Sequence, residues 1–384
     1  MTVTSAKGFL AAGIAAGIKS SGNPDLALVV SQGPKYAAAG VFTGNRVKAA
    51  PVLWTQQVLG STSALKAVIL NSGGANACTG PAGFADTHHT AEHVAAVLGI
   101  APIDVAVCST GLIGERLPMP KLLAGAETAA AALSAGGGAD AAHAIMTTDS
   151  VPKTASRQGN GYTIGGMAKG AGMLAPGLAT MLVVITTDAD IDAPALDAAL
   201  REATGRTFDR IDSDGCMSTN DTVLVLANGA SGVVPPHTEF VVLLTEVCGE
   251  LARALIADAE GATKDIRIHV TSADTERDAL EVARAVSRSN LLKCAIHGED
   301  PNWGRVLSAI GTTAAAFEPD EIDVAINGVW VCRNGMTGDP RDLVSMKERE
   351  VQITIDLRAG AAEATLWTND LTAMYVHENS AYSS

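Results

Sequence analysis

The sequence contains no hydrophobic run that approaches the roughly 18–20 residues of a membrane-spanning helix. It is also short of positive charge, because 27 Lys and Arg stand against 41 Asp and Glu and give a formal net charge of −14. Proteins that bind nucleic acid regardless of its sequence need Lys and Arg to displace counterions from the phosphates. We therefore expect neither a membrane nor a nucleic acid as a partner.

Paired cysteines are missing as well. The six cysteines have no C-x-x-C spacing, which excludes the common zinc-ribbon patterns and offers no disulfide framework. The apolar segment 9–18 runs into Lys19 without a clear cleavage site, so it is not typical of a signal peptide. We expect reduced, mostly buried thiols in a cytoplasmic protein. The cysteines are Cys78, Cys108, Cys216, Cys248, Cys294 and Cys332.

Several familiar catalytic motifs are also absent. The chain has no GxxxxGK[ST], no GxSxG and no HExxH, which excludes the simplest phosphate-loop, serine-hydrolase and zinc-protease interpretations. His89 and His93 are four residues apart and could share one helical face and bind a metal ion. Because no third ligand is evident, a solvated helix face is the preferred interpretation, and we expect no metal site.

A sizeable core is available, since hydrophobic residues make up 47% of the 384 positions, enough for one large domain or two ordinary ones. Short, mostly β-branched runs predict strands, and Ala-rich stretches between them have helical spacing, which indicates a layered α/β or α+β architecture. From Asp320 onward strands dominate, so a purely parallel sheet is not expected. The predicted strands are Leu26–Val30, Ala67–Leu70, Val105–Cys108, Met181–Ile185, Thr222–Leu226, Phe240–Leu244, Ile266–Val270, Ile322–Ile326 and Val351–Ile355, and the predicted helices are Thr90–Leu98, Leu122–Ala135, Ala195–Thr204 and Thr275–Ser287.

The most unusual segment is Gly165–Ala179, which is dense in glycine and leads directly into a predicted strand that begins with Thr180. Glycines permit positive φ angles and close backbone approach at an entropic cost. If the bond before Thr180 were broken, the new α-amine would lie beside the Thr180 hydroxyl and could act as its base, since its reference pKa is about 7.7–8.0. The alternative interpretation is a tight turn that leads into an ordinary strand residue.

Two further loops carry candidate groups. Thr110 and Gly111 place a hydroxyl and a flexible N–H side by side and could hold a developing oxyanion, although Ser-Thr-Gly is also a common turn. Lys169 lies inside the glycine-rich segment, where a carboxylate-binding or nucleophile-tuning role and an ordinary solvated side chain both stay open. Glu260 and Lys264 share a glycine-containing loop, where a surface ion pair is the simplest interpretation.

The run GMAKGAGMLAPGLATML at 166–182 resembles the self-cleavage site of the ornithine acetyltransferase family, the glutamate N-acetyltransferases of arginine biosynthesis. Other runs resemble further signatures of that family, in the same order along the chain. They are Asn71–Gly80, Ser109–Gly114, Met146–Asp149, Asp214–Thr222, Glu260–Lys264, Gly298–Gly304 and Glu378–Ser384. Together these runs extend over essentially the whole chain, and their combination is highly specific.

The resemblance implies a fold and a processing step. The fold is the layered α/β sandwich of the DmpA/ArgJ type, with mixed sheets flanked by helices. In the processing step, the Thr180 hydroxyl attacks the carbonyl carbon of Ala179. Cleavage leaves an α chain, 1–179, that carries the oxyanion loop and a β chain, 180–384, that begins with the nucleophile. The two chains stay associated, and two such pairs form an α2β2 assembly.

The resemblance also implies the roles of individual residues. Thr180 is the acetyl-accepting nucleophile, and Thr110 and Gly111 form the oxyanion hole. The implied substrate-contacting residues are Thr147, Lys169, Thr180, Glu260, Asn379 and Ser384. Thr147 aligns better than Thr148, which stays an alternative. Neither a metal ion nor another cofactor is implied.

The implied reaction is transfer of acetyl from N2-acetyl-L-ornithine to L-glutamate. Both amino acids carry an α-carboxylate, so one cationic anchor can hold either, and sequential use of one pocket requires a covalent acetyl carrier and ping-pong kinetics. Alternatives are an amidase or aminopeptidase that passes the acyl group to water, and an inactive scaffold protein. Whether acetyl-CoA also serves as a donor stays open.

Overall fold

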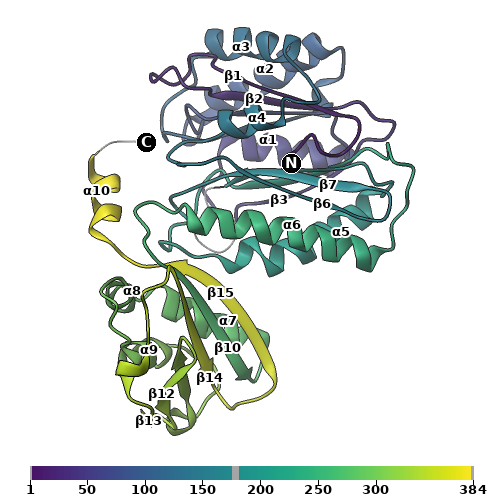
Figure 1. Cartoon of the computed structure of the whole chain (residues 1–384). Helices are drawn as coiled ribbons and strands as arrows, with labels where there is room; N and C mark the ends of the chain where they lie inside the picture. The colour runs from purple at the N-terminus through teal and green to yellow at the C-terminus, as the bar shows by residue number, and fades with distance from the viewer. Residues whose placement is uncertain (1, 175–180, 382–384) are drawn as a thin grey trace. The chain divides into compact units, whose positions relative to one another are not determined.

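The computed structural model describes residues 2–174 and 181–381, which fall into two compact units (Figure 1). Within these ranges, the first unit comprises the residues up to Asp209 together with 216–258. The second comprises 210–215 and the residues from Ala259 onward. These units are compact parts of the folded structure. The predicted division into chains 1–179 and 180–384 concerns cleavage instead and stays a prediction.

The described part of the first unit contains two mixed sheets, with the strand orders β1-β2-β4-β5 and β3-β9-β8-β7-β6. The pairs β4–β5 and β8–β9 are parallel and the other pairs are antiparallel. The strands are β1 (Phe9–Ile14), β2 (Leu26–Ser31), β3 (Ala37–Phe42), β4 (Ala67–Asn71), β5 (Val105–Ser109), β6 (Lys153–Gln158), β7 (Thr163–Lys169), β8 (Leu182–Thr187) and β9 (Thr222–Ala227).

Helices separate and cover these sheets. The helices α1 and α4 lie between the two sheets, α2 and α3 cover the outer side of the first, and α5 and α6 cover the outer side of the second (Figure 1). They are α1 (Ala50–Thr62), α2 (Gly80–Leu98), α3 (Met119–Ala131), α4 (Gly138–Ala144), α5 (Ala193–Arg206) and α6 (His237–Ala257). One core cluster takes residues from both sheets, among them Val29, Leu70 and Val184. The layered α/β fold with mixed sheets is confirmed.

The central strands of the second sheet explain why their sequences read as continuous apolar runs. Every residue of β8 and of β9 is buried, because helices cover both faces of the sheet. Proline in the first turn helps to start α1, α2, α3 and α5, where its missing N–H costs nothing. At α5 the carboxylate of Asp192 also accepts the N–H of Ala195 as an N-cap.

The second unit is a six-stranded sheet in the order β13-β12-β11-β14-β10-β15, with α7 packed on β10 and β15. Only β10 and β14 pair in parallel among its described strands, so the expectation that no purely parallel sheet forms is confirmed. Its elements are β10 (Asp265–Ala273), α7 (Glu276–Ser287), α8 (Asn290–His297), α9 (Trp303–Ile310), β11 (Asp323–Ile326), β12 (Val329–Arg333), β13 (Met336–Thr337), β14 (Glu350–Asp356), β15 (Ala362–Asn369) and α10 (Ala373–Ala381).

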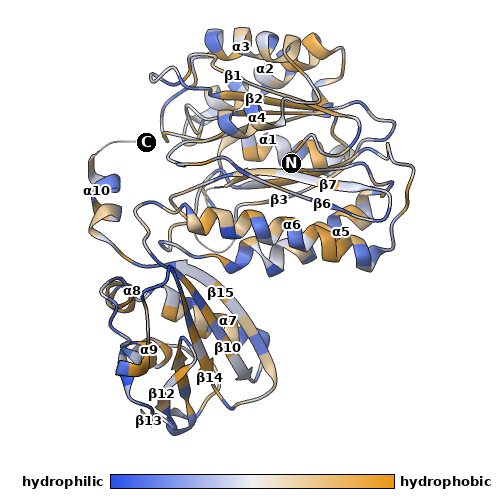
Figure 2. Cartoon of the chain, in the orientation of Figure 1, coloured by the Kyte–Doolittle hydropathy of each residue, from blue (hydrophilic) through white to orange (hydrophobic). Residues whose placement is uncertain are grey.

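One predicted strand is wrong. The run Phe240–Leu244 lies inside α6, a helix of 21 residues. Buried positions recur along this helix at Phe240, Leu244, Val247 and Leu251, which is helical spacing, whereas Val242 is exposed. Figure 2 shows the corresponding change between hydrophobic and hydrophilic colours along α6. A short apolar run does not by itself distinguish a strand from one buried stripe of a longer helix.

The thiols only partly follow expectation. Cys108, Cys248 and Cys332 are buried, but Cys78, Cys216 and Cys294 are exposed, so the prediction of mostly buried thiols is wrong for half of them. Burial raises the pKa of Cys108 to about 12. Over the described ranges, every helix is too short or too polar to cross a membrane.

Candidate functional site

The predicted cleavage segment connects two strands whose ends lie side by side. Lys169, Leu182 and Thr222 lie in register across β7, β8 and β9. The end of β7 and the start of β8 therefore lie side by side, at the same ends of the strands. Ala179 and Thr180, the predicted cleavage site and nucleophile, lie outside the described residues, and their roles stay predictions. The buried Met181 is the first described residue after them.

The predicted oxyanion loop follows β5 and is fixed by its backbone. The N–H of Thr110 donates to the carbonyl of Asn71 at 3.0 Å, and the carbonyl of Thr110 accepts the N–H of Gly74 at 3.0 Å. Gly111 has a φ of +131°, and a Cβ there would lie 2.7 Å from the nitrogen of Gly74. The position therefore requires glycine, for both its conformation and its space.

The structure brings Thr110 and Lys169 together, although Thr110 follows β5 of the first sheet and Lys169 ends β7 of the second. Both side chains are buried, and Nζ of Lys169 donates to Oγ1 of Thr110 at 3.3 Å. A hydroxyl that accepts from an ammonium group keeps its own proton for donation. The arrangement can therefore direct the Thr110 O–H toward a developing negative charge, with a cation close behind it.

The predicted substrate contact Thr147 lies next to a buried group of charges. Its N–H donates to Oδ2 of Asp149 at 3.0 Å, and Oδ1 of Asp149 accepts Nζ of Lys153 at 2.6 Å. Burial alone would raise the pKa of Asp149, but the nearby Lys169 and Lys153 together with these hydrogen bonds lower it to about 2. Asp149 is therefore ionised at neutral pH.

A second buried carboxylate lies beside the start of β8. Oδ1 of Asp221 accepts the N–H of Met181 at 3.1 Å, and Oδ2 has no hydrogen-bond partner within residues 2–174 and 181–381. Burial raises the pKa of Asp221 well above its usual range, against the opposing effects of the Met181 N–H, of Ser218 and of Lys169. A buried carboxyl group with a raised pKa thus holds the N–H of the residue that follows the predicted nucleophile.

Sequence reasoning missed Asp149, Asp221 and Lys19 as members of this region. Nζ of Lys19 donates to the carbonyl of Met146 at 2.6 Å, directly before Thr147, and burial lowers the pKa of Lys19. Asp149 and Asp221 both lie inside runs that resemble family signatures, which was the available signal. A single acidic residue has no spacing that distinguishes a structural from a functional role.

Glu260 and Asn379, two other predicted substrate contacts, belong to the second unit. Nδ2 of Asn379 donates to Oε2 of Glu260 at 2.9 Å. The surface ion pair between Glu260 and Lys264 is not formed, because Lys264 pairs instead with Glu299 at 2.9 Å and donates to three backbone carbonyls. Ser384, the last predicted contact, lies outside the described residues.

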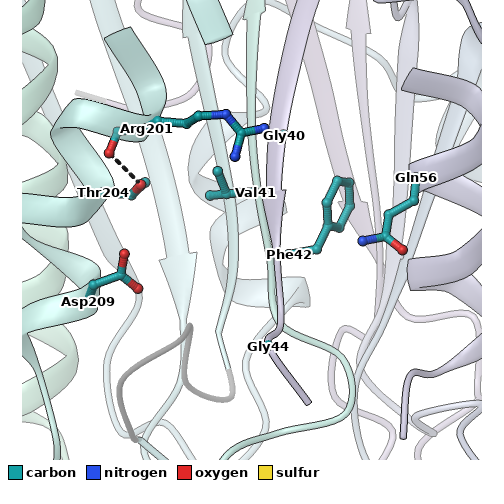
Figure 3. Close-up of a pocket in the computed structure, with 8 residues that line it drawn as sticks. All are labelled: Gly40, Val41, Phe42, Gly44, Gln56, Arg201, Thr204 and Asp209. Atoms are coloured by element: carbon teal, nitrogen blue, oxygen red, sulfur yellow. Dashed lines mark hydrogen bonds between the residues drawn. The ribbon is translucent and has the colours of Figure 1, made fainter. Parts of the chain in front are cut away.

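A separate cavity of about 450 Å³ lies along the edge strand β3, between residues of α1 and α5 (Figure 3). The backbone carbonyl of Arg201 accepts the hydroxyl of Thr204 there at 3.3 Å, and the guanidinium of Arg201 pairs with Asp197. Its lining residues are Gly40, Val41, Phe42, Gly44, Gln56, Arg201, Thr204 and Asp209. None of them is a predicted site residue.

The two histidines that could have bound a metal ion lie on α2. His89 is exposed, and Nε2 of His93 lies 3.1 Å from a carboxylate oxygen of Glu127. No group of three or more His, Cys, Asp or Glu side chains suited to a metal ion occurs in the described part of the chain.

Known proteins match the chain over its length. It is 68% identical to "Arginine biosynthesis bifunctional protein ArgJ" of Streptomyces coelicolor and 62% identical to that of Thermobifida fusca, over 384 residues that cover both chains fully in each case. A solved structure of ornithine acetyltransferase complexed with ornithine from Mycobacterium tuberculosis is 64% identical and covers 47% of this chain and 96% of that chain, at a TM-score of 0.45. The model of the ArgJ family matches residues 10–384. The resemblance found in the sequence is thereby confirmed, and the chain belongs to the ArgJ family.

Proposed function

We propose that this ArgJ-family acetyltransferase of arginine biosynthesis moves an acetyl group from N2-acetyl-L-ornithine to L-glutamate through an acetyl ester on Thr180. The observation that carries the proposal is the buried contact between Lys169 and Thr110 at the end of β7, directly before the predicted cleavage segment. It places a cation and a hydroxyl donor together at the point where acyl chemistry is predicted.

The first step is self-cleavage. Oγ of Thr180 bonds to the carbonyl carbon of Ala179, the C–N bond breaks, and the hydroxyl proton is passed to the nitrogen, which becomes the free α-amine of residue 180. Water then hydrolyses the ester and leaves chains 1–179 and 180–384. The new amine has an ordinary pKa near about 7.7–8.0, so it can accept a proton at neutral pH.

Acetyl transfer uses the same atoms. The amine takes the hydroxyl proton while Oγ of Thr180 attacks the acetyl carbon of the donor, and ornithine leaves with that proton. The amino group of glutamate then attacks the ester and regenerates the hydroxyl. In both halves the carbonyl oxygen gains negative charge, which the Thr110 hydroxyl and the Gly111 N–H would stabilise.

The substrates explain the charged contacts. The α-carboxylate common to both substrates suits Lys169, and Thr147, Glu260, Asn379 and Ser384 supply the other predicted contacts. We further place the protein in the cytoplasm as an α2β2 assembly of cleaved chains. The same nucleophile would accept acetyl from acetyl-CoA as a second donor.

Intact mass measurement of the purified protein tests the first step. We expect two chains that meet between Ala179 and Thr180, and a single uncleaved chain for Thr180→Ala with no acetyl transfer. A fully active enzyme with an intact 179–180 bond would contradict the proposal.

Product analysis tests the second step. Incubation with N-acetylornithine alone should add one acetyl group to the chain that begins with Thr180, and glutamate should then remove it as N-acetylglutamate. Release of free acetate at an unchanged rate without glutamate would favour the amidase or aminopeptidase alternative.

A further inference from the structure

Asp149 lies in the segment between α4 and β6. Its carboxylate accepts hydrogen bonds at two places of the candidate site and pairs with a buried lysine. Its side chain is fully buried. Oδ2 accepts the N–H of Thr147 at 3.0 Å, and Oδ1 accepts both the N–H of Gly170 at 2.6 Å and Nζ of Lys153 at 2.6 Å. One carboxylate therefore joins its own segment, through Thr147 and Lys153, to the end of β7.

Two of these three partners lie at predicted substrate contacts. Thr147 is itself a predicted contact, and Gly170 directly follows Lys169 at the end of β7. Hydrogen bonds from backbone N–H groups to an ionised carboxylate are short and strong in a buried environment. They fix the peptide planes at both places, so the carboxylate restrains the backbone from which each contact residue projects.

The third partner, Lys153, supplies the countercharge. Nζ of Lys153 lies 2.6 Å from both Asp149 and Asp258, and its side chain is 1% exposed. Asp258 in turn accepts the N–H and the hydroxyl of Ser150, which closes the network. Lys153 offsets one of these two negative charges, and the nearby Lys169 also favours the ionised form of Asp149 while it donates to Thr110.

We propose that Asp149 is a positioning residue for acetyl transfer, which holds the backbones at Thr147 and at the end of β7 so that Lys169 meets Thr110 and the substrate carboxylate in one geometry. This proposal rests on the proposed function. The alternative is that Asp149 only stabilises the fold. The test therefore needs a measured quantity that a loss of stability alone does not change.

A double-mutant cycle with Lys169 provides that readout. Asp149→Asn keeps the shape but removes the charge and one acceptor, and Lys169→Met removes the ammonium group. We expect Asp149→Asn to lower kcat/KM per mole of cleaved enzyme by about 10²-fold, the scale of a displaced contact group. In the Lys169→Met background the same change should cost less than about threefold, because Asp149 acts through Lys169.

Asp323→Asn in the second unit is the matched control, because Asp323 is also a buried carboxylate that accepts a backbone N–H and pairs with cations. We expect it to lower the melting temperature while kcat/KM stays within twofold of the wild type. If a variant accumulates uncleaved, the rate constant of self-cleavage replaces kcat/KM in the cycle. If Asp149→Asn does not fold, Asp149→Asn/Lys153→Met removes both charges together and replaces it.

Two results would overturn the proposal: kcat/KM close to the wild type in folded Asp149→Asn, or losses from Asp149→Asn and Lys169→Met that simply multiply. Failure of the proposed function has a different signature, since the wild-type enzyme itself would then show no cleavage before Thr180 or no acetylation of that residue.

Discussion

Asp149 in the first unit and Asp323 in the second are buried carboxylates of similar chemistry with different neighbours. Asp323 accepts the N–H of Asn334 at 2.7 Å and pairs with Arg333 and Arg358, whose side chains are 46% and 42% exposed. The lysine partner of Asp149 is 1% exposed instead. A charge pair that is closed from water is costly to build and is retained where a fixed geometry is needed.

The backbone N–H groups that Asp149 and Asp323 bind also differ in their places in the fold. The N–H groups bound by Asp149 belong to Thr147 and Gly170, at two places of the candidate site. The N–H bound by Asp323 belongs to the turn between β12 and β13. Similar electrostatics therefore stabilises a hairpin in one unit and, as we propose, arranges reacting groups in the other. Three further changes test this distinction, in order of decreasing expected effect.

The largest effect is expected at Thr110. Thr110→Val removes the hydroxyl at nearly constant volume and should lower kcat by about 10²–10³-fold, the usual cost of losing one oxyanion donor. Thr110→Ser keeps the hydroxyl and should retain most of the activity. Thr365→Val in the second unit removes a hydroxyl bonded to His269 and should leave kcat unchanged. Steady-state kinetics on cleaved enzyme measure all three, and an active Thr110→Val enzyme would show that the hydroxyl stabilises no charge.

Thr110 also shows how far the sequence could lead. Its loop was identified as an oxyanion candidate because a hydroxyl and a glycine N–H are adjacent in sequence. Its contact with Lys169 joins residues that are 59 positions apart and lie at the ends of strands in different sheets, so no local spacing indicates it. The strands around it were predictable since β8 and β9 are apolar throughout, whereas the stripe on α6 was mistaken for a strand.

The charged groups were harder to predict for a physical reason. Asp149 and Asp221 acquire their properties from burial and from partners that the fold supplies, such as the N–H groups of Gly170 and Met181. Neither environment is a property of neighbouring sequence positions. Family signatures marked the right segments, but only the assembled first unit shows that the pKa of Asp149 is lowered and that of Asp221 is raised.

An intermediate effect is expected in the acid unfolding of the two carboxylate variants. The folded pKa of Asp149 is about 2 against an ordinary 3.8, so its ionisation contributes about 2 kcal/mol at pH 7, which is lost as the pH falls from about 5 to 2. The stability gap between the wild type and Asp149→Asn should therefore shrink over that window. The pKa of Asp323 is lowered as well, although burial opposes this, so its gap should shrink in the same direction.

Urea unfolding at pH values between 3 and 7 measures both gaps. We expect Asp149→Asn to show the larger one, because its partners are buried and screened less by water. A gap for Asp149→Asn that stays constant with pH would mean that folding does not shift the pKa of Asp149, and the charge network proposed around it would then be wrong.

The smallest effect is expected at a glycine that lies outside the candidate site and in no tight turn. Gly60 is an exposed residue of α1, and a Cβ there meets no atom within 4 Å, whereas at Gly111 it would strike the backbone of Gly74. Gly60→Ala should raise the free energy of unfolding by roughly 0.5–1 kcal/mol through helix propensity, with unchanged kcat/KM. Gly111→Ala should instead destabilise the oxyanion loop and lower kcat. Thermal melts and kinetics of the two variants test both expectations. Equal losses of activity in Gly60→Ala and Gly111→Ala would show that activity does not depend on the backbone conformation at Gly111 in particular.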